Sequence, residues 1–223
     1  MNFFAVPVMD EYGDTTYQLT AAGYTALVIV LLAVLLLGCA LFGGKKKMNA
    51  KQLAFSAMAI TLATVTSMIK LFDMPMGGSV TLLSMLFICL IGYWYGLGGG
   101  LTAAFAYGIL QLVIDPYILS VPQMLVDYVF AFGALGLSGL FYNSRHGLIK
   151  GYLVGVLGRY FFSFLSGWIF FGTYAPEGFP NAAVYSLAYN GAYLGAEALI
   201  TVIIIAIPPV SKALASVKQQ AVS

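Results

Sequence analysis

Charged residues are scarce in this chain. Only 8% of its 223 residues are charged, whereas an ordinary soluble domain carries about 25%. With 61% hydrophobic residues and a mean hydropathy of +0.93, the chain has too few charges to cover a soluble globule or to keep a disordered chain solvated. Its net charge of +2 gives no reason to expect a nucleic-acid partner. These absences exclude a soluble enzyme and leave a polytopic membrane protein.

The groups that carry most enzyme chemistry are also scarce. The sequence has one histidine, His146, and two cysteines, Cys39 and Cys89, which both lie in apolar runs and are interpreted as packing residues. We find no histidine, cysteine and carboxylate cluster for a metal, no serine elbow and no Gly-Lys-Ser/Thr phosphate loop. We therefore expect no metal, no cofactor, no enzymatic activity and no ATP site of the phosphate-loop type in this chain.

Long apolar runs predict an all-α membrane protein, because a spanning helix needs about 20 mostly apolar residues. The first run, 19–42, follows an acidic segment and precedes three lysines. A secretory signal peptide has the opposite charge pattern, so this run is interpreted as a retained span. Segments with turn-forming residues separate six further runs. These runs are 52–71, 79–96, 100–114, 122–142, 150–172 and 184–207.

The basic residues predict how the chain is oriented. An outer N-terminus and seven crossings place eight basic residues inside, as the positive-inside rule requires. These residues are Lys45, Lys46, Lys47, Lys51, Arg145, Lys150, Lys212 and Lys218. The predicted organisation is an extracellular segment (1–18), an extra membrane helix with a basic inner linker (19–47), a six-helix membrane domain (48–210) and a cytoplasmic tail (211–223).

Three ionisable residues fall inside predicted helices. A charge at mid-bilayer costs at least about 2.5 kcal/mol, so Asp127, Arg159 and Glu197 are expected to face the bundle interior. For Arg159 and Glu197, a structural ion pair and a role in a binding site both remain open. Asp127 lies near the outer mouth, where a carboxylate suits a cationic or hydrogen-bond-donating ligand. Lys70, at the outer end of its helix, is expected to snorkel without a role.

Aromatic and polar side chains gather around the same outer end. Interfacial aromatic belts account for about half of them. However, Ser163 lies four residues after Arg159, and Asn190 seven before Glu197, so polar groups share helix faces and need partners. This pattern predicts an aromatic-lined cavity for a flat, cationic heteroaromatic molecule.

Several separate motifs resemble one known family. They lie at 74–85, 117–120, 127–141, 158–167, 174–178 and 184–191. In this order they are similar to the thiamine-specific substrate-binding subunits (S-components) of energy-coupling factor transporters. The resemblance covers about 48–207 and implies a six-helix S-component bundle with an outward-opening vitamin pocket, here preceded by one extra, peripheral helix.

The resemblance also implies a binding site. In this family the acid at the position of Asp127 contacts the aminopyrimidine of thiamine. This chain departs from the family by having Ser163 in place of a histidine and Phe171 in place of a tryptophan found in some members, with Trp168 one turn earlier. The predicted substrate-binding residues are Tyr117, Asp127, Tyr128, Arg159, Ser163, Trp168, Phe171, Tyr185 and Asn190.

Partners follow from the same resemblance. S-components of the bacterial plasma membrane dock on a membrane coupling subunit that is attached to two ATPase subunits. Docking uses small residues spaced by four, which let helices approach closely. Ala50/Ala54 and Ala59/Ala63 have this spacing, although alanine is also common in membrane helices generally.

Other functions remain open at this stage. The ligand could be a thiamine precursor, a phosphate ester, an analogue or another vitamin. The chain could also be a stand-alone secondary carrier, or a structural subunit of a larger membrane complex. A membrane enzyme has no catalytic constellation to support it.

Overall fold

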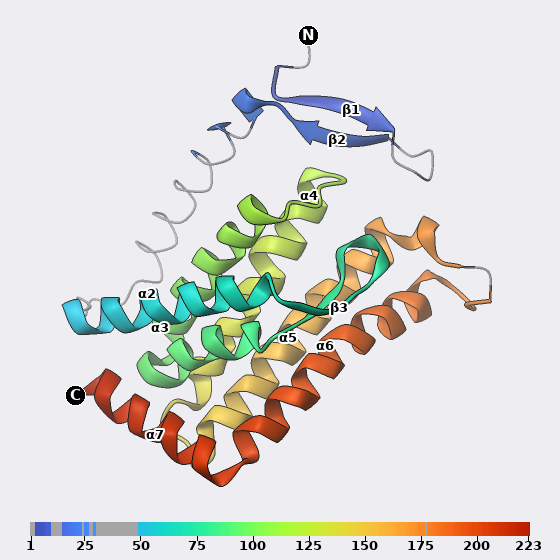
Figure 1. Cartoon of the computed structure of the whole chain (residues 1–223). Helices are drawn as coiled ribbons and strands as arrows, with labels where there is room; N and C mark the ends of the chain where they lie inside the picture. The colour runs from blue at the N-terminus through green and yellow to red at the C-terminus, as the bar shows by residue number, and fades with distance from the viewer. Residues whose placement is uncertain (1–2, 10–14, 24, 27–28, 30–48, 177) are drawn as a thin grey trace.

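The computed structural model describes residues 3–9, 15–23, 25–26, 29, 49–176 and 178–223. Most of the predicted extra span and its basic linker, 19–47, therefore lies outside the described residues, as does Cys39. At the N-terminus, β1 (Ala5–Met9) and β2 (Thr15–Leu19) pair antiparallel, with Ala5 opposite Leu19. The remaining elements build one helical body (Figure 1).

Helices make up most of this body. Their bounds are α2 (Ala50–Ser67), α3 (Ser84–Ile114), α4 (Val121–Met124), α5 (Gly147–Phe170), α6 (Ala182–Ala206) and α7 (Pro208–Val222). After α4 the chain continues as a π-helix, Leu125–Ala131, and a 3₁₀ helix, Ala134–Phe141. Short 3₁₀ turns lie at Pro75–Gly77 and Gly172–Tyr174. The predicted runs 122–142, 150–172 and 184–207 correspond to Val121–Phe141, α5 and α6 within a few residues.

Local chemistry explains where α2 begins. The Asn49 side chain accepts a hydrogen bond from the Gln52 amide nitrogen (2.8 Å), and the Gln52 side chain accepts one from the Asn49 nitrogen (3.2 Å). This reciprocal capping box satisfies two amides that a helix start leaves unpaired. The helix ends at Ser67, so the last residues of the predicted run 52–71 belong to a strand instead.

The predicted break between the runs 79–96 and 100–114 lies within α3, where two helical stretches meet at a kink, whereas residues 79–81 of the first run form a strand. At Gly96 the backbone has φ 78° and ψ −169°, a conformation that favours glycine. Glycines near this kink let α3 and the segment Ala134–Phe141 approach each other closely. A Cβ on Gly139 would lie 2.3 Å from the Gly96 carbonyl carbon, so α3 and Ala134–Phe141 touch backbone to backbone.

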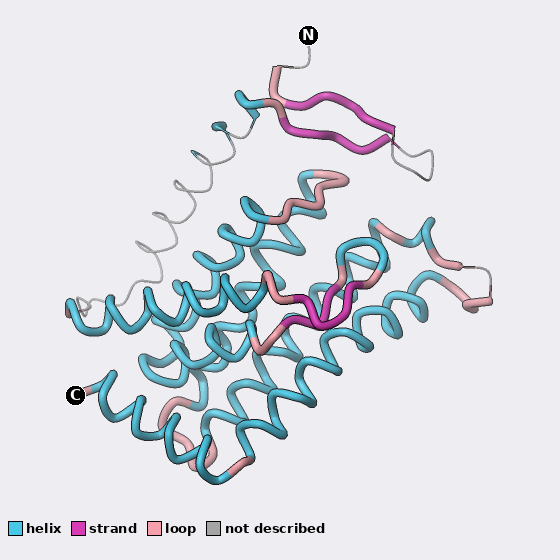
Figure 2. The backbone as a smooth tube through the Cα atoms, viewed as in Figure 1, coloured by secondary structure: helices cyan, strands magenta, loops and turns pink. Residues whose placement is uncertain are grey.

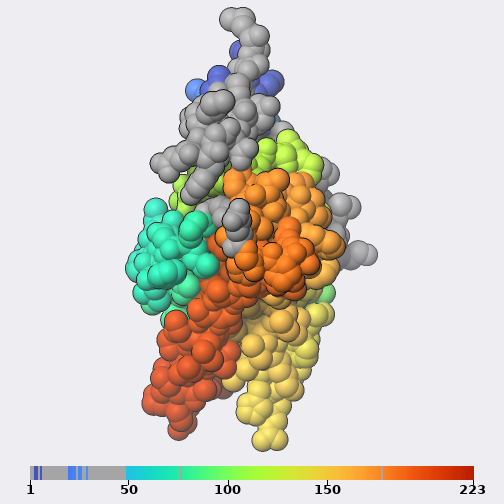
Figure 3. Space-filling view, turned by 90° about the vertical axis from the view of Figure 1, so that its right-hand side faces the viewer, coloured from blue at the N-terminus to red at the C-terminus, as the bar shows by residue number. Residues whose placement is uncertain are grey.

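A small antiparallel hairpin separates α2 from α3. Strands β3 (Lys70–Asp73) and β4 (Ser79–Thr81) pair with Lys70 opposite Thr81 and an irregularity before Phe72. Figure 2 shows the two strand pairs of the described residues in magenta. In Figure 3 this hairpin (teal) lies beside the N-terminal part of α6 (orange). The hairpin was not predicted from the apolar runs.

The predicted tail is helical. Pro208 and Pro209 begin α7, because proline fits the first turn of a helix. Residues Val210, Leu214, Val217 and Ala221 are its more buried side chains. The Lys218 ammonium nitrogen lies 3.7 Å from the Tyr93 ring centroid and donates to the Tyr142 carbonyl oxygen, which attaches α7 to the bundle.

The buried core lies between α3, α5 and the Val121–Phe141 segment. Met85, Ile88, Cys89, Leu135 and Tyr152 are all fully buried there. Within the described ranges, four helices are long and apolar enough to cross a membrane: α3, Val121–Phe141, α5 and α6. The seven spans and the N-out, C-in orientation remain a prediction.

Candidate functional site

A cavity of about 170 Å³ lies at the hairpin end of the body. Its lining comes from the end of α2, the hairpin, α3, the loop after α3, the segment from Gln123 to Phe132, α5 and α6. Residues far apart in the sequence therefore meet around one space. Eight predicted site residues line it: Tyr117, Asp127, Tyr128, Arg159, Ser163, Phe171, Tyr185 and Asn190.

Trp168, the ninth predicted residue, is not among the lining residues. Gly167 and Phe171 line the cavity from α5, whereas Trp168 is 49% exposed and stacks on Phe164, with ring centroids 5.7 Å apart. Consecutive residues of a helix point about 100° apart, so the neighbour of Gly167 points elsewhere. The prediction that Trp168 contacts the ligand is therefore corrected.

Asp127 lies on the π-helix Leu125–Ala131, a geometry often found at functional sites. Its Oδ2 atom accepts hydrogen bonds from Gln123 Nε2 (2.6 Å) and Ser166 Oγ (2.8 Å). Both donors are neutral, so the carboxylate is hydrogen-bonded without forming an ion pair in the described part of the chain. Sequence reasoning missed Gln123 and Ser166. The only signal was the spacing of four residues between Gln123 and Asp127.

Arg159 and Glu197 do not form an ion pair with each other in the structure described here. The Arg159 guanidinium carbon lies 4.1 Å from the Phe132 ring centroid, a cation–π contact. This arrangement overturns the structural ion pair left open by the sequence and leaves Arg159 among the cavity-lining residues.

Glu197 instead holds the start of α3. Its Oε2 atom accepts from Thr81 Oγ1 (2.7 Å) and the Thr81 nitrogen (3.0 Å), and its Oε1 atom accepts from the Met85 nitrogen (3.2 Å). A carboxylate is favourable at a helix N-terminus, where the backbone N–H groups are unpaired. Glu197 thus fixes the hairpin and α3 to α6.

Polar groups between α5 and α6 satisfy one another. Asn190 Nδ2 donates to the Ser186 carbonyl oxygen (3.0 Å), and Asn190 Oδ1 accepts from the Tyr193 hydroxyl (2.9 Å). The Ser186 hydroxyl donates to the Phe164 carbonyl oxygen (2.8 Å). Asn190 is thereby fixed in the cavity wall. At the end of α5, Phe171 stacks on Tyr117, with ring centroids 5.7 Å apart.

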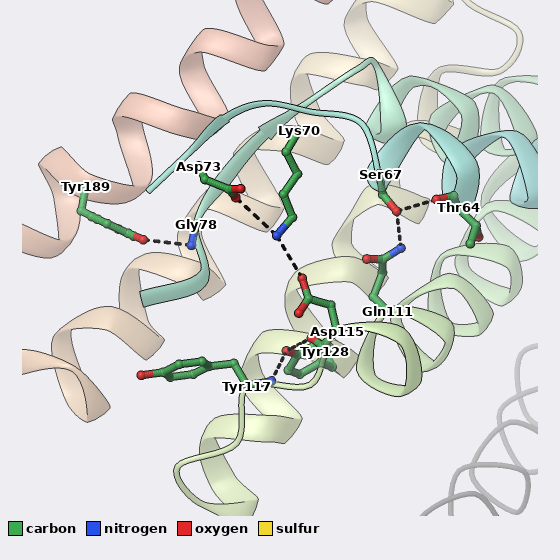
Figure 4. A network of polar contacts seen from close by, with 10 residues as sticks. All are labelled: Thr64, Ser67, Lys70, Asp73, Gly78, Gln111, Asp115, Tyr117, Tyr128 and Tyr189. Carbon is green, nitrogen blue, oxygen red and sulfur yellow. Dashed lines mark hydrogen bonds and ion pairs between the residues drawn. The ribbon is translucent and has the colours of Figure 1, made fainter. Parts of the chain in front are cut away.

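An ionic contact spans the mouth of the cavity (Figure 4). Lys70 Nζ lies 3.3 Å from Asp73 Oδ1, in the same hairpin, and 3.4 Å from Asp115 Oδ2, just after α3. Burial lowers the pKa of Lys70, but the two carboxylates outweigh it and the pKa is raised. Lys70 therefore joins two elements, a role that the snorkelling prediction missed.

Two tyrosine hydroxyls also fix the mouth (Figure 4). The Tyr189 hydroxyl accepts from the Gly78 nitrogen (2.9 Å) and donates to the Pro75 carbonyl oxygen. The Tyr128 hydroxyl accepts from the Tyr117 nitrogen (2.8 Å) and donates to the Asp115 carbonyl oxygen (2.9 Å). These bonds hold the hairpin turn to α6 and the loop after α3 to the π-helix.

The alanines predicted for docking differ in exposure. Ala59 and Ala63 are 2% and 0% exposed in the core, and the Ala63 carbonyl oxygen accepts from the Tyr107 hydroxyl (3.3 Å). That pair cannot contact a partner, which corrects half of the prediction. Ala50 and Ala54 are exposed on α2. Among the described residues, no group of three histidine, cysteine or acidic side chains could hold a metal ion.

The fold and the cavity define a helical membrane protein with an internal site for one small molecule that carries both aromatic and polar surface. Comparison with known proteins gives the family. A model described as thiamine transporter protein matches residues 53–216, and the chain belongs to this family. This confirms the resemblance to thiamine-specific S-components, and the family is one of transporters rather than enzymes.

Individual relatives cover most of the described body. The chain is 34% identical over 164 residues to the thiamine transporter ThiT of Bacillus subtilis, covering 67% of this chain and 83% of the relative. It is 27% identical over 172 residues to ThiT of Lacticaseibacillus paracasei, covering 70% and 82% respectively. A solved structure of ThiT from Listeria monocytogenes matches with TM-score 0.63 and 26% identity, covering 76% of this chain and 96% of that one.

Proposed function

We propose that this chain is the thiamine-binding S-component of an energy-coupling factor transporter in the bacterial plasma membrane. It captures thiamine from outside and delivers it through a membrane coupling subunit driven by two separate ATPase subunits. The observation that carries the proposal is the Asp127 carboxylate in a cavity that also presents the Tyr117–Phe171 stack. The names of the related transporters support the same ligand.

The chemistry of thiamine matches these groups. Its aminopyrimidine ring carries an exocyclic amino group that can donate to a carboxylate oxygen. Its thiazolium ring is flat and cationic, so it gains from contact with aromatic faces. Asp127 supplies the acceptor, and Tyr117, Phe171 and Tyr185 supply ring surface around the same space. A ligand with only one of these features uses only part of the site.

A ligand panel tests the proposal. Purified full-length protein is titrated calorimetrically, and its thermal unfolding is followed, with thiamine, its pyrimidine half, its phosphate esters and unrelated vitamins. Thiamine should bind saturably and stabilise the protein, and the unrelated vitamins should do neither. Absence of both effects at micromolar thiamine overturns the proposed ligand. Fluorescence of Trp168 is a poor readout because this ring lies outside the cavity lining.

One observation favours a second ligand. Arg159 lines the cavity and has no carboxylate partner among the described residues. A guanidinium binds phosphate well, so a phosphate ester of thiamine is the second candidate. Tighter binding of the monophosphate than of thiamine, lost in Arg159→Gln, would select it.

Transport assays separate coupled uptake from a stand-alone carrier. The chain is reconstituted in vesicles alone and together with a coupling subunit and ATPases. The proposal expects uptake only in the complete, ATP-supplied system. Gradient-driven uptake by the chain alone, without ATP, would identify a secondary carrier instead.

A further inference from the structure

The two oxygens of Asp127 have different surroundings. Oδ2 accepts hydrogen bonds from Gln123 Nε2 at 2.6 Å and from Ser166 Oγ at 2.8 Å. Within the described residues, Oδ1 forms neither a hydrogen bond nor an ion pair. The carboxylate is therefore held by one oxygen, while the other keeps its capacity to accept.

The donors that hold Oδ2 are themselves fixed. Gln123 and Ser166 are each 1% exposed. The Gln123 amide also donates to the Tyr117 carbonyl oxygen (3.1 Å) and accepts from the Leu119 nitrogen (3.0 Å). Both amide hydrogens and the amide oxygen are thus engaged, so Gln123 has no N–H left to offer a ligand. Its contacts serve Asp127 and the loop that carries Tyr117.

We propose that Gln123 and Ser166 are positioning residues that orient Asp127 so that Oδ1 alone accepts from the ligand. The inference rests on the proposed function, in which the ligand presents the exocyclic amino group of an aminopyrimidine. That amino group stands beside a ring nitrogen with an exposed lone pair. A carboxylate free to present both oxygens would bring its second oxygen against this lone pair, which is repulsive.

Holding Oδ2 on two donors of the protein removes this conflict. One N–H donates to Oδ1, and the ring nitrogen no longer faces a carboxylate oxygen. The arrangement therefore determines specificity as well as affinity. A ligand with the amino group gains affinity from the hydrogen bond to Oδ1. An otherwise identical ligand without the amino group gains none.

The test compares two ligands in matched variants. Thiamine and an analogue in which hydrogen replaces the pyrimidine amino group are titrated against the wild type, Gln123→Met and Ser166→Ala. Each variant should lose about tenfold in thiamine affinity, as expected for a hydrogen bond to a charged group. Affinity for the analogue should change less than about threefold, so discrimination between the two ligands falls by more than about threefold in each variant.

Control variants remove comparable groups elsewhere. Ser56→Ala deletes a buried hydroxyl of α2 that has no hydrogen-bond partner in the described part of the chain, and Gln219→Met changes an exposed amide of α7. Both should keep the wild-type discrimination. The unfolding temperature of each ligand-free variant is measured alongside, because a merely structural role would lower it and weaken both ligands equally.

The outcomes separate the two proposals. Suppose that the wild type binds thiamine, but each variant loses affinity for both ligands equally or for neither. This result would overturn the positioning role and leave the proposed function standing. Wild-type protein that does not bind thiamine would overturn the proposed function and the positioning role with it. Loss confined to thiamine in both variants is the result that we expect.

Discussion

At the scale of single residues, Asp127 is the centre of the proposed binding chemistry. Replacing it with asparagine keeps the shape of the side chain and removes the charge. Hydrogen bonds to charged groups are worth about 1.5–3 kcal/mol, so Asp127→Asn should weaken thiamine binding roughly tenfold or more. Titration calorimetry measures the loss, and thermal unfolding of the ligand-free protein shows whether the fold is intact. Unchanged affinity in a folded variant would reject the contact.

The sequence predicts the ionisable residues of this site better than the neutral ones. Asp127 and Arg159 stand out because a charge in an apolar helix is costly and needs a reason. Gln123 and Ser166 are neutral, so placing them in an apolar helix does not have the cost of a buried charge. Ser166 also lies 39 residues from Asp127, on another helix. Periodicity along one helix cannot identify such a pair. The prediction that Trp168 contacts the ligand has a related weakness. Gly167 and Phe171 on the same helix line the cavity, whereas Trp168 does not.

At the scale of elements, the mouth of the cavity depends on the contact from the β3–β4 hairpin to the end of α3. Lys70 reaches both Asp73 in its own hairpin and Asp115 beyond α3. Because the carboxylates outweigh burial and raise the pKa of Lys70, this side chain stays charged through the neutral range. The bridge therefore keeps its lysine charge under ordinary assay conditions and weakens where strongly basic solution removes the proton from Lys70.

Breaking the contact between the elements should speed ligand release. Exposed ion pairs contribute at most about 1 kcal/mol, so Asp115→Asn should raise the thiamine dissociation rate by no more than about fivefold. Asp73→Asn is the matched control, because it removes a contact within the hairpin and leaves the bridge to Asp115. Chase experiments at low and high salt measure the thiamine dissociation rate of each variant. Equal acceleration by both variants, or no effect of salt, would count against the bridge.

Apolar runs predict α5 and α6 well because burial in lipid requires length and hydropathy, which a sequence displays directly. The same criterion misses the β3–β4 hairpin, since its strands of four and three residues are too short to give a pattern. The predicted break at Gly96 to Gly100 falls at the kink of α3, where Gly96 leaves the helical conformation. There the glycines permit backbone contact between helices, and only the three-dimensional packing reveals that role.

At the scale of the whole molecule, orientation is still a prediction from the basic residues. It places the C-terminal helix α7 and Lys51 on the cytoplasmic side. The Lys51 ammonium donates to the Ser223 hydroxyl (2.9 Å), so both lie at the same end of the molecule. A fluorescent protein that folds only in the cytoplasm, fused after Ser223, should fluoresce. A dark but stably inserted fusion would invert the predicted topology.

Exposed alanines on α2 are the remaining candidates for contact with a coupling subunit. Close helix packing needs small side chains, so Ala50→Leu with Ala54→Leu should abolish ATP-driven uptake and leave thiamine binding intact. Ala206→Leu, at an exposed position of α6, is the control and should preserve both. Binding is measured on the isolated chain and uptake on the reconstituted complex. Full uptake by the double variant would place the partner on another face, whereas loss of binding as well would indicate damage to the fold.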